Sequence, residues 1–126
     1  MILTKSKIFK EVCNKNICIE PFDDDMLNPN SYNYRLGRFL KETINSDEEK
    51  VKFKTIDLYD YPSGYLLEPG KFYLGTTFEV VGSKKYAMSL IGRSSIGRYG
   101  MFLQVSANLG HTGSCHCWTL EIVTAQ

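Results

Sequence analysis

The chain has 126 residues, the length of one domain, and no apolar run approaches the ~20 residues of a membrane span. Hydrophobic residues make up 43% and charged residues 23%, the ordinary mix of a globular protein with one core. The formal net charge is only +1, which argues against binding along a nucleic-acid backbone or an anionic membrane. We expect any phosphate recognition to be confined to a pocket.

The first predicted element is a helix over about 5–14. Thr4 is a suitable N-cap, and apolar side chains follow it at helical spacing: Ile8, Phe9, Val12 and Cys13. Asn14 and Asn16 can end the helix, since Asn tolerates the left-handed conformation. A short strand over 17–19 and a turn-rich loop over 23–31 come next.

The rest of the chain alternates between short strands and turns. The predicted strands cover 34–40, 51–57, 72–80, 86–91, 101–107 and 115–123, with an exposed loop at 45–50 and a turn at 68–70. In the second of them, alternation places residues 51, 53, 55 and 57 on one face. This spacing predicts a mainly β fold, a barrel or sandwich, with a helix at the front.

The densest group of chemically competent residues is the segment 92–100, Gly-Arg-Ser-Ser-Ile-Gly-Arg-Tyr-Gly. The guanidinium groups of Arg93 and Arg98 offer forked donors that match phosphate. Ser hydroxyls and main-chain amides beside glycine complete a cradle for an anion. The alternative is a surface turn with solvated arginines, and composition alone leaves both interpretations open.

The strand over 115–123 carries one acidic side chain. Alternate residues share a face of a strand, so Trp118, Leu120 and Ile122 form an apolar face that we expect in the core. Glu121 then points away from the core, into a groove or into solvent.

Several segments resemble the dCTP deaminase family, in the same order along the chain. They are Met-Ile-Leu-Thr at 1–4, the segments 19–23, 28–37, 67–72, 77–79 and 92–100, and Thr-Leu-Glu at 119–121. The resemblance covers essentially all 126 residues. The Arg-Ser-Ser motif is shared with trimeric dUTPases, whereas the N-terminal block and the Thr-Leu-Glu strand favour the deaminase branch.

The resemblance implies one domain over 1–126: a distorted β-barrel of the dUTPase-like (β-clip) class with a short N-terminal helix. It also implies a homotrimer whose active sites are shared between neighbouring subunits. The implied reaction is hydrolysis of dCTP to dUTP and ammonia, with Mg²⁺ bound through the substrate triphosphate and no zinc.

Three residues carry the catalytic roles that the resemblance implies. Glu121 is the general acid/base that activates water against C4 of cytosine and delivers the proton to the leaving amine. Ser94 helps to hold the water, and Arg98 lies close to Glu121 and the nucleotide.

The remaining roles concern binding. The resemblance assigns the triphosphate to Arg93 and Ser95 and to the main chain of the loop 93–98, which includes Ile96 and Gly97. Thr119 and Leu120 flank the base.

The chemistry is consistent with this assignment. Water is a poor nucleophile at neutral pH, so a deaminase without a metal needs a base tuned by its surroundings, and a carboxylate near arginines can serve. Zinc-dependent deaminases need His-x-Glu with Pro-Cys-x-x-Cys, and this sequence contains neither.

Three features depart from the family pattern. The Asp that contacts deoxyribose in the family falls on His111, which can still hydrogen-bond a sugar hydroxyl and is kept as a substrate-binding residue. Asn33 stands where Asp is usual, which we interpret as a structural change. Relatives continue for a few tens of residues past the position of Gln126, so the sequence is either a fragment or a naturally short form with an open or partner-completed site.

A metal site is the less favoured interpretation of His111, Cys115, His116 and Cys117. On a strand Cys115 and Cys117 share one face while His116 points to the other, so at most three ligands converge, whereas zinc takes four. We expect no metal held by the protein and a solvated acidic loop at 23–25. The start lacks a signal peptide, so a cytoplasmic location and reduced thiols are expected.

Two functions from different classes therefore remain. The first is a dCTP deaminase-like hydrolase acting on dCTP or a related pyrimidine nucleotide. The second is a non-catalytic nucleotide-binding or sensing module that keeps the phosphate cradle. A dUTPase or a bifunctional deaminase-diphosphatase is a further alternative.

Overall fold

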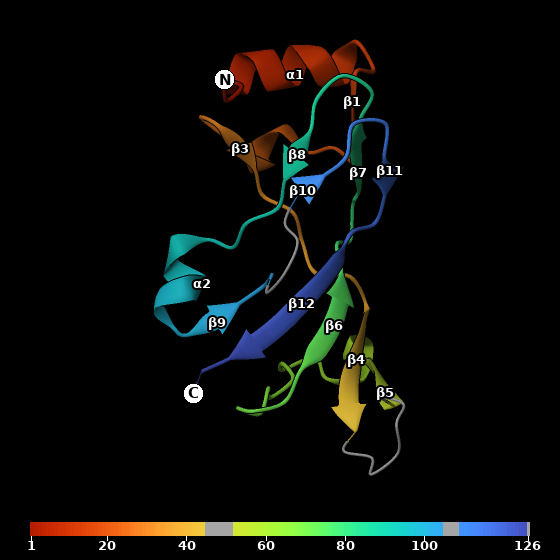
Figure 1. The fold of residues 1–126 in the computed structure, drawn as a ribbon, viewed down its shortest axis with the longest axis vertical. Helices are drawn as coiled ribbons and strands as arrows, with labels where there is room; N and C mark the ends of the chain where they lie inside the picture. The colour runs from red at the N-terminus through yellow and green to blue at the C-terminus, as the bar shows by residue number, and fades with distance from the viewer. Residues whose placement is uncertain (45–51, 105–108, 126) are drawn as a thin grey trace. The chain divides into compact units, whose positions relative to one another are not determined.

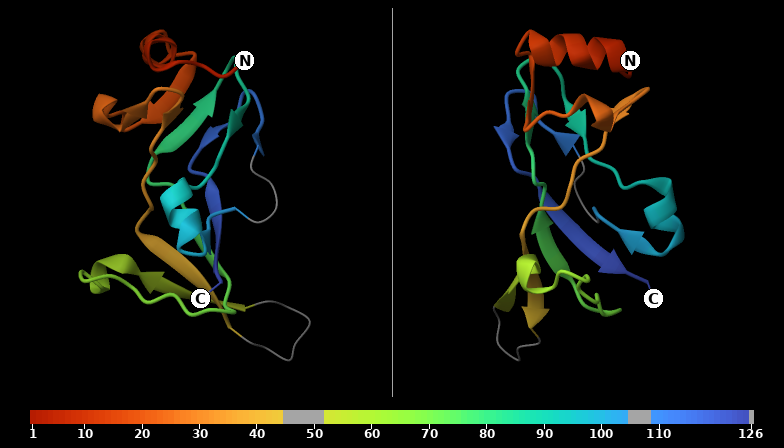
Figure 2. Two further views of the ribbon diagram at one scale, coloured as in Figure 1. Left: turned by 90° about the vertical axis from the view of Figure 1, so that its left-hand side faces the viewer. Right: turned by 180° about the vertical axis from the view of Figure 1, so that it is seen from behind.

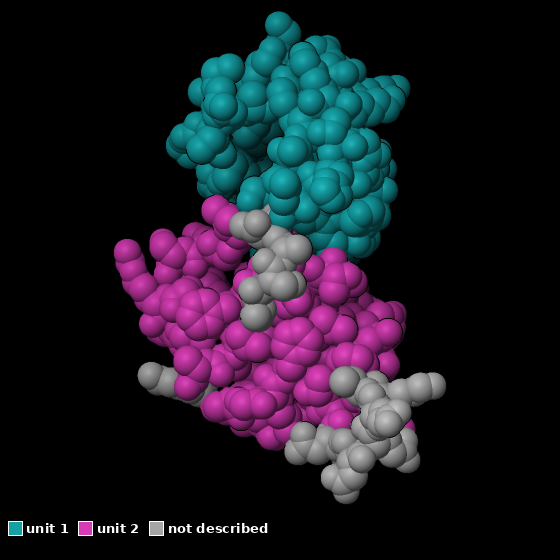
Figure 3. All heavy atoms as spheres, in the orientation of Figure 1, with its two compact units in different colours: residues 1–36, 77–89, 109–118 teal, residues 37–76, 90–108, 119–126 magenta. Residues whose placement is uncertain are grey.

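The computed structural model describes residues 1–44, 52–104 and 109–125. The chain forms two compact units, each assembled from three separate stretches (Figure 3). Unit 1 comprises Met1–Leu36, Thr77–Ser89 and Leu109–Trp118; unit 2 comprises Gly37–Thr76, Leu90–Asn108 and Thr119–Gln126. The single domain expected over residues 1–126 stays a prediction. In the described ranges no helix is both long enough and apolar enough to cross a membrane.

Unit 1 combines a helix with three small antiparallel sheets (Figure 1). The sheets are β1-β7-β11, β10-β8 and the β2-β3 hairpin. The elements are α1 (Lys5–Cys13), β1 (Ile17–Glu20), the 3₁₀ turn η1 (Asp24–Met26), β2 (Leu27–Asn28), β3 (Ser31–Tyr32), β7 (Val80–Ser83), β8 (Met88–Ser89), β10 (Leu109–Gly110) and β11 (Cys115–His116).

The structure confirms the helix predicted at the N-terminus. Thr4 occupies the N-cap position, but its side chain makes no capping hydrogen bond. Ile8 is buried on the inner face of α1. The left-handed residue after the helix is Lys15, with φ 62°, rather than one of the asparagines.

Apolar side chains from several elements fill the core of unit 1: Ile8, Ile17, Ile19, Leu27, Val81 and Trp118. The indole N–H of Trp118 donates to the Val81 carbonyl at 3.1 Å, which satisfies the one polar atom of that ring. Gly110 lies against the indole, where a Cβ would come within 2.2 Å of a ring carbon. The packing of Trp118 therefore requires glycine at this point.

Unit 2 contains a five-stranded antiparallel sheet in the order β5-β4-β6-β12-β9 (Figures 1 and 2). Leu40, Ile56, Tyr73, Leu120 and Ile122 are buried in it. The elements are β4 (Phe39–Ile44), β5 (Lys52–Asp57), the 3₁₀ turn η2 (Leu58–Asp60), β6 (Tyr73–Thr76), the short helix α2 (Ser94–Arg98), β9 (Met101–Phe102) and β12 (Thr119–Thr124).

The strand predicted over 72–80 is two strands, β6 and β7, which pair with different partners. The main-chain N–H of Phe78 donates to the Arg35 carbonyl at 2.7 Å. The hydroxyl of Thr77 donates to the Glu79 carbonyl at 2.7 Å. β6 pairs with β4 and β12, whereas β7 pairs with β1 and β11, so the change of partners divides the segment. Thr77 and Glu79, between the two strands, are both buried.

Other strands are shorter than predicted. In the segment 34–40, only β4 from Phe39 onward is a strand, and Leu36 makes an isolated bridge to Thr77. The segment 86–91 reduces to β8, 101–107 begins with β9, and 115–123 splits into β11 and β12. The predicted loop at 45–50 and residues 51 and 105–107 lie outside the described residues.

The buried residue of β5 is Ile56, on the face that alternates with the one shared by residues 53, 55 and 57. Ile56 is 4% exposed, whereas Phe53 on the opposite face is 38% exposed. Ile56 pairs with Leu40 of β4, which is also buried, so the partner strand decides which face turns inward.

The mainly β fold with a short N-terminal helix is confirmed. In the described part of the chain the strands form open sheets rather than a closed barrel.

Candidate functional site

The Gly-Arg-Ser-Ser segment, predicted as a loop over 93–98, is the single-turn helix α2 and its flanks. The N–H of Gly97 donates to the Arg93 carbonyl at 3.0 Å and closes the turn. Arg93 is the N-cap and makes no side-chain capping bond. Arg93, Ser94, Ser95, Gly97 and Arg98 are exposed and Ile96 is half-buried. The polar groups expected to bind a nucleotide are thus presented to solvent.

A tight turn connects α2 to β9, which pairs with β12, the strand that carries Glu121. Gly100 adopts φ 82°, a left-handed conformation that favours glycine, and leads into β9. Its carbonyl accepts a hydrogen bond from the Ala125 N–H at 2.8 Å. β9 then pairs with β12 through Val123 opposite Phe102. The residues of α2 and β12 both belong to unit 2 (Figure 3).

Glu121 lies on β12 between two core residues. Leu120 and Ile122 are 1% and 3% exposed, while Glu121 is half-buried on the other face. The alternation predicted for this strand is therefore confirmed. The main-chain N–H of Glu121 donates to the Leu103 carbonyl at 3.1 Å.

Gln104 is a neighbour that the sequence did not predict. Its amide Nε2 donates to Oε1 of Glu121 at 3.1 Å. Seventeen positions separate the two residues, and only the pairing of β9 with β12 brings them together. The one sequence signal that could have indicated this contact is that Gln104 lies in the strand predicted over 101–107.

The other predicted binding residues differ in what they can offer. Thr119 is exposed at the start of β12, and Leu120 is buried, so only its main chain could reach a base. His111 is exposed in unit 1, in the turn between β10 and β11, where its carbonyl accepts from the Ser114 N–H at 3.1 Å. All the other predicted site residues belong to unit 2.

Two further carboxylates of unit 2 are held by cations. The Lys71 ammonium and then the Tyr65 hydroxyl lower the pKa of Glu42 by hydrogen bonding. The Arg38 guanidinium lowers the pKa of Asp57 through a bidentate contact at 2.9 and 2.7 Å. A lowered pKa makes a carboxylate a weaker base, so these two residues fit a structural role.

In unit 1, hydrogen bonding from the Tyr86 hydroxyl lowers the pKa of the buried Glu11, and Lys85 lies 3.7 Å away. Glu121 accepts a hydrogen bond from a neutral amide, that of Gln104. A neutral donor orients a carboxylate without adding a positive charge beside it.

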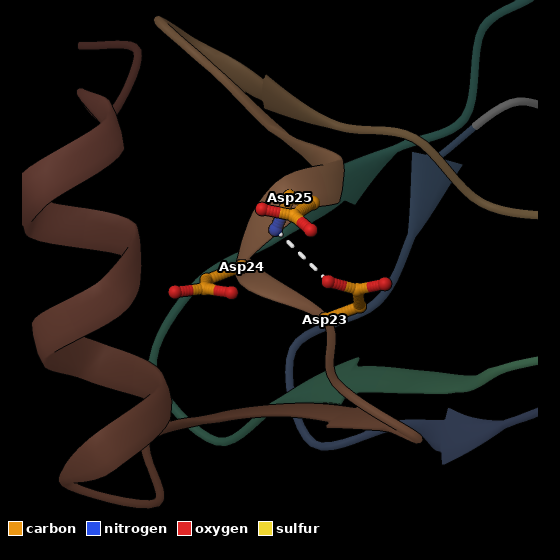
Figure 4. A group of neighbouring side chains, drawn as sticks. All are labelled: Asp23, Asp24 and Asp25. Carbon is orange, nitrogen blue, oxygen red and sulfur yellow. Dashed lines mark hydrogen bonds between the residues drawn. The ribbon is translucent and has the colours of Figure 1, made fainter.

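Potential metal ligands gather at one place in the described residues, the loop Asp23, Asp24 and Asp25, with ligand atoms within 4.8 Å of one another (Figure 4). Oδ1 of Asp23 accepts from the Asp25 N–H at 2.9 Å and so caps η1. This capping accounts for Asp23, and acidic groups in an exposed loop are common without an ion.

His111, Cys115, His116 and Cys117 do not form such a group. Nδ1 of His116 instead contacts the Cys117 carbonyl at 3.0 Å. Cys115 lies by Cys18, and burial, followed by their hydrogen bond, raises the pKa of the Cys18 thiol to about 11.

Comparison with known proteins identifies the class. Residues 2–126 match the family model described as dCTP deaminase-like. The chain therefore belongs to the dCTP deaminase-like family, a family of enzymes, as the resemblance of its motifs predicted.

Curated relatives share the name dCTP deaminase, dUMP-forming. The protein from Cytophaga hutchinsonii is 47% identical over 123 residues, which cover 97% of this chain and 70% of the relative. That from Hathewaya histolytica is 44% identical over 129 residues, covering 100% of this chain and 73% of the relative. That from Clostridium acetobutylicum is 45% identical over 126 residues, covering 97% and 70%. Their name gives dUMP as the product, whereas the motif resemblance implies dUTP.

A crystal structure of 2'-deoxycytidine 5'-triphosphate deaminase from Agrobacterium tumefaciens has the same fold, with a TM-score of 0.72. The match covers 98% of this chain and 41% of that chain at 21% identity. At this identity the likeness is one of fold.

Proposed function

We propose that this protein deaminates dCTP by hydrolysis and carries the product on to dUMP. The observation that carries the proposal is Glu121, a half-buried carboxylate in the same unit as the exposed Arg93, Ser94 and Arg98. Overall, dCTP and two waters give dUMP, ammonia and diphosphate. The name shared by relatives 43–47% identical to this chain supports dUMP as the product.

Glu121 is the general base in this proposal. Its carboxylate takes a proton from the water that attacks C4 of cytosine and returns the proton to the departing amine. Ser94 holds the water by hydrogen bonding, and Arg98 stabilises charge near the carboxylate and the nucleotide. These roles need no redox chemistry and no metal held by the protein.

The nucleotide is bound through its phosphates in this proposal. Arg93 and Ser95 contact the triphosphate, together with main-chain groups of Ile96 and Gly97. Thr119 and the main chain of Leu120 flank the base, and His111 hydrogen-bonds the sugar.

Mg²⁺ fits this site as a companion of the substrate. The side chains on and around α2 are hydrogen-bond donors such as Arg93 and Arg98, which suit phosphate oxygens rather than a cation. The ion would therefore be held by the triphosphate, whose charge it neutralises.

We also propose that the protein works as a homotrimer in the cytoplasm. The family resemblance supports sharing of each active site between neighbouring subunits. Light scattering on the purified protein measures the oligomeric state, and a monomer at micromolar concentration contradicts the trimer.

Nucleotide turnover tests the proposed function. The purified chain is incubated with Mg²⁺ and dCTP, the nucleotides are separated by chromatography, and ammonia is measured by a coupled assay. Glu121→Gln removes the base with little change in shape, and Glu20→Gln, an exposed carboxylate of β1, is the matched control.

Release of dUMP and ammonia that is lost in Glu121→Gln and kept in Glu20→Gln supports the proposal. Accumulation of dUTP would support the deamination step and contradict the proposed hydrolysis of dUTP to dUMP. Tight binding of dCTP with no product would favour the nucleotide-binding module instead.

A further inference from the structure

Gln104 and Glu121 are joined twice, once through side chains and once through the main chain next to them. The Gln104 amide donates to Oε1 of Glu121 at 3.1 Å. The Leu103 carbonyl, one residue before Gln104, accepts from the Glu121 N–H at 3.1 Å. The main-chain hydrogen bond fixes the position of Gln104 along β12. The side-chain hydrogen bond then holds the Gln104 amide against the Glu121 carboxylate.

Such a contact restricts the one torsion of glutamate that is otherwise loosely defined. Rotation of a carboxylate about its last carbon–carbon bond is broad, because that bond joins a tetrahedral to a planar carbon. A donor fixed on the neighbouring segment selects one orientation of the carboxylate plane. A general base must hold its oxygen within hydrogen-bond reach of the proton it removes, so this selection bears directly on the reaction.

The chemistry of the donor matters as well as its position. An amide N–H does not titrate near neutral pH, so it leaves the proton taken from water on Glu121. Its hydrogen bond favours the ionised form of the carboxylate, which is the form that acts as a base. Lys71 lowers the pKa of Glu42 by a charged contact instead.

We propose that Gln104 is the positioning residue for Glu121: its amide aims the carboxylate at the attacking water. This inference rests on the proposed deaminase function. Nothing in the sequence motifs assigns Gln104 a role.

Two substitutions separate positioning from general stability. Gln104→Met keeps the length of the side chain and removes the donor. Gln104→Glu keeps the shape and places a second carboxylate against Glu121, so that the pair shares a proton. Each is measured for kcat and KM on dCTP from pH 5 to 9, alone and in the Glu121→Gln background, with the melting temperature as a check on folding.

The expected result is a fall in kcat of roughly 10- to 100-fold for Gln104→Met, with KM changed by less than about threefold. The acid limb of the kcat profile moves to higher pH in Gln104→Met and further in Gln104→Glu. In the Glu121→Gln background, Gln104→Met has no additional effect on residual turnover, because the residue acts through the missing carboxylate.

Wild-type kcat with an unmoved pH profile in both variants overturns the positioning role and leaves the deaminase intact. A loss confined to KM, or one that persists in the Glu121→Gln background, also overturns it. No turnover by the unmodified protein overturns the deaminase function and this inference with it.

Discussion

Arg35 donates twice to one buried carboxylate, that of Glu79. Its main-chain N–H reaches Oε1 at 2.8 Å, and its guanidinium Nε reaches Oε2 at 3.0 Å. Glu79 is fully buried and the Arg35 side chain is 48% exposed, packed over the Phe78 ring at 4.6 Å. A buried charge is tolerated when it is paired and hydrogen-bonded, so this pair fixes the loop 33–38 to the segment before β7.

Loss of the guanidinium should destabilise unit 1 strongly. Arg35→Met leaves the Glu79 carboxylate buried with its main-chain donor alone, and we expect a loss of about 3 kcal/mol in the free energy of unfolding. Urea denaturation followed by circular dichroism measures it. The matched control is Lys52→Met, an exposed cation of β5. An equal change in both variants would contradict this role for Arg35.

Stability should fall at acid pH because of Glu42. Hydrogen bonds from Lys71 and Tyr65 lower the pKa of this carboxyl from its ordinary value of 4.5. A lowered pKa stabilises the fold above the unfolded value, and that stabilisation disappears as the pH falls through the folded value. Urea midpoints between pH 3 and 7 check this expectation. In Lys71→Met the folded pKa of Glu42 lies closer to its ordinary value, so the acid-dependent loss should be smaller and complete at a higher pH than in the unmodified protein.

The cluster of Glu42, Lys71 and Tyr65 also predicts a loss of stability at alkaline pH. Hydrogen bonding to Glu42, followed by burial, raises the pKa of Tyr65 from 10.0 to about 12. A raised pKa stabilises the fold below the unfolded value, and this contribution is lost as the pH rises from 10 towards 12. Phenolate absorbance during an alkaline titration, compared with Tyr65→Phe, reports the late titration of this group. A difference spectrum centred at pH 10 would contradict it.

Glycine is required at position 82. A Cβ there would lie 1.8 Å from the Ser114 carbonyl oxygen and 2.5 Å from the Cys115 Cα, both main-chain atoms. Gly82→Ala must therefore displace β11 from β7, and we expect a loss of at least about 2 kcal/mol. In Gly97→Ala the new methyl meets nothing within 4 Å in a helical turn, so stability should be kept or slightly raised. Thermal unfolding of both variants makes the comparison.

The Cys18 thiol should react slowly with alkylating reagents. Burial, followed by the hydrogen bond with Cys115, raises its pKa to about 11, so at pH 8 about one molecule in a thousand carries the reactive thiolate. Peptide mapping after iodoacetamide treatment should show Cys13, which is exposed, modified well before Cys18. Cys115→Ala removes one cause of the shift and should speed the reaction of Cys18. Equal rates at Cys13 and Cys18 would rule out the protection.

Local sequence was sufficient to predict those features that depend on a single segment of the chain. The helix after Thr4 follows from the spacing of its apolar residues, and the burial of Leu120 and Ile122 beside Glu121 follows from alternation on a strand. The motif at 92–100 and the Thr-Leu-Glu strand were enough to indicate the family that residues 2–126 match. Short-range periodicity and contiguous motifs are properties of the chain itself, so no partner segment is needed to interpret them.

The tertiary structure decided what depends on two distant segments. Ile56 faces inward because Leu40 lies opposite it, and the strand over 72–80 divides because β6 pairs with β4 and β12 whereas β7 pairs with β1 and β11. The contact of Gln104 with Glu121 exists only because β9 pairs with β12. Contiguous motifs identified the class of protein and the candidate base, whereas strand pairing set the inward faces and brought Gln104 to Glu121. The physical reason is that side-chain alternation leaves two faces equivalent until another strand packs against one of them.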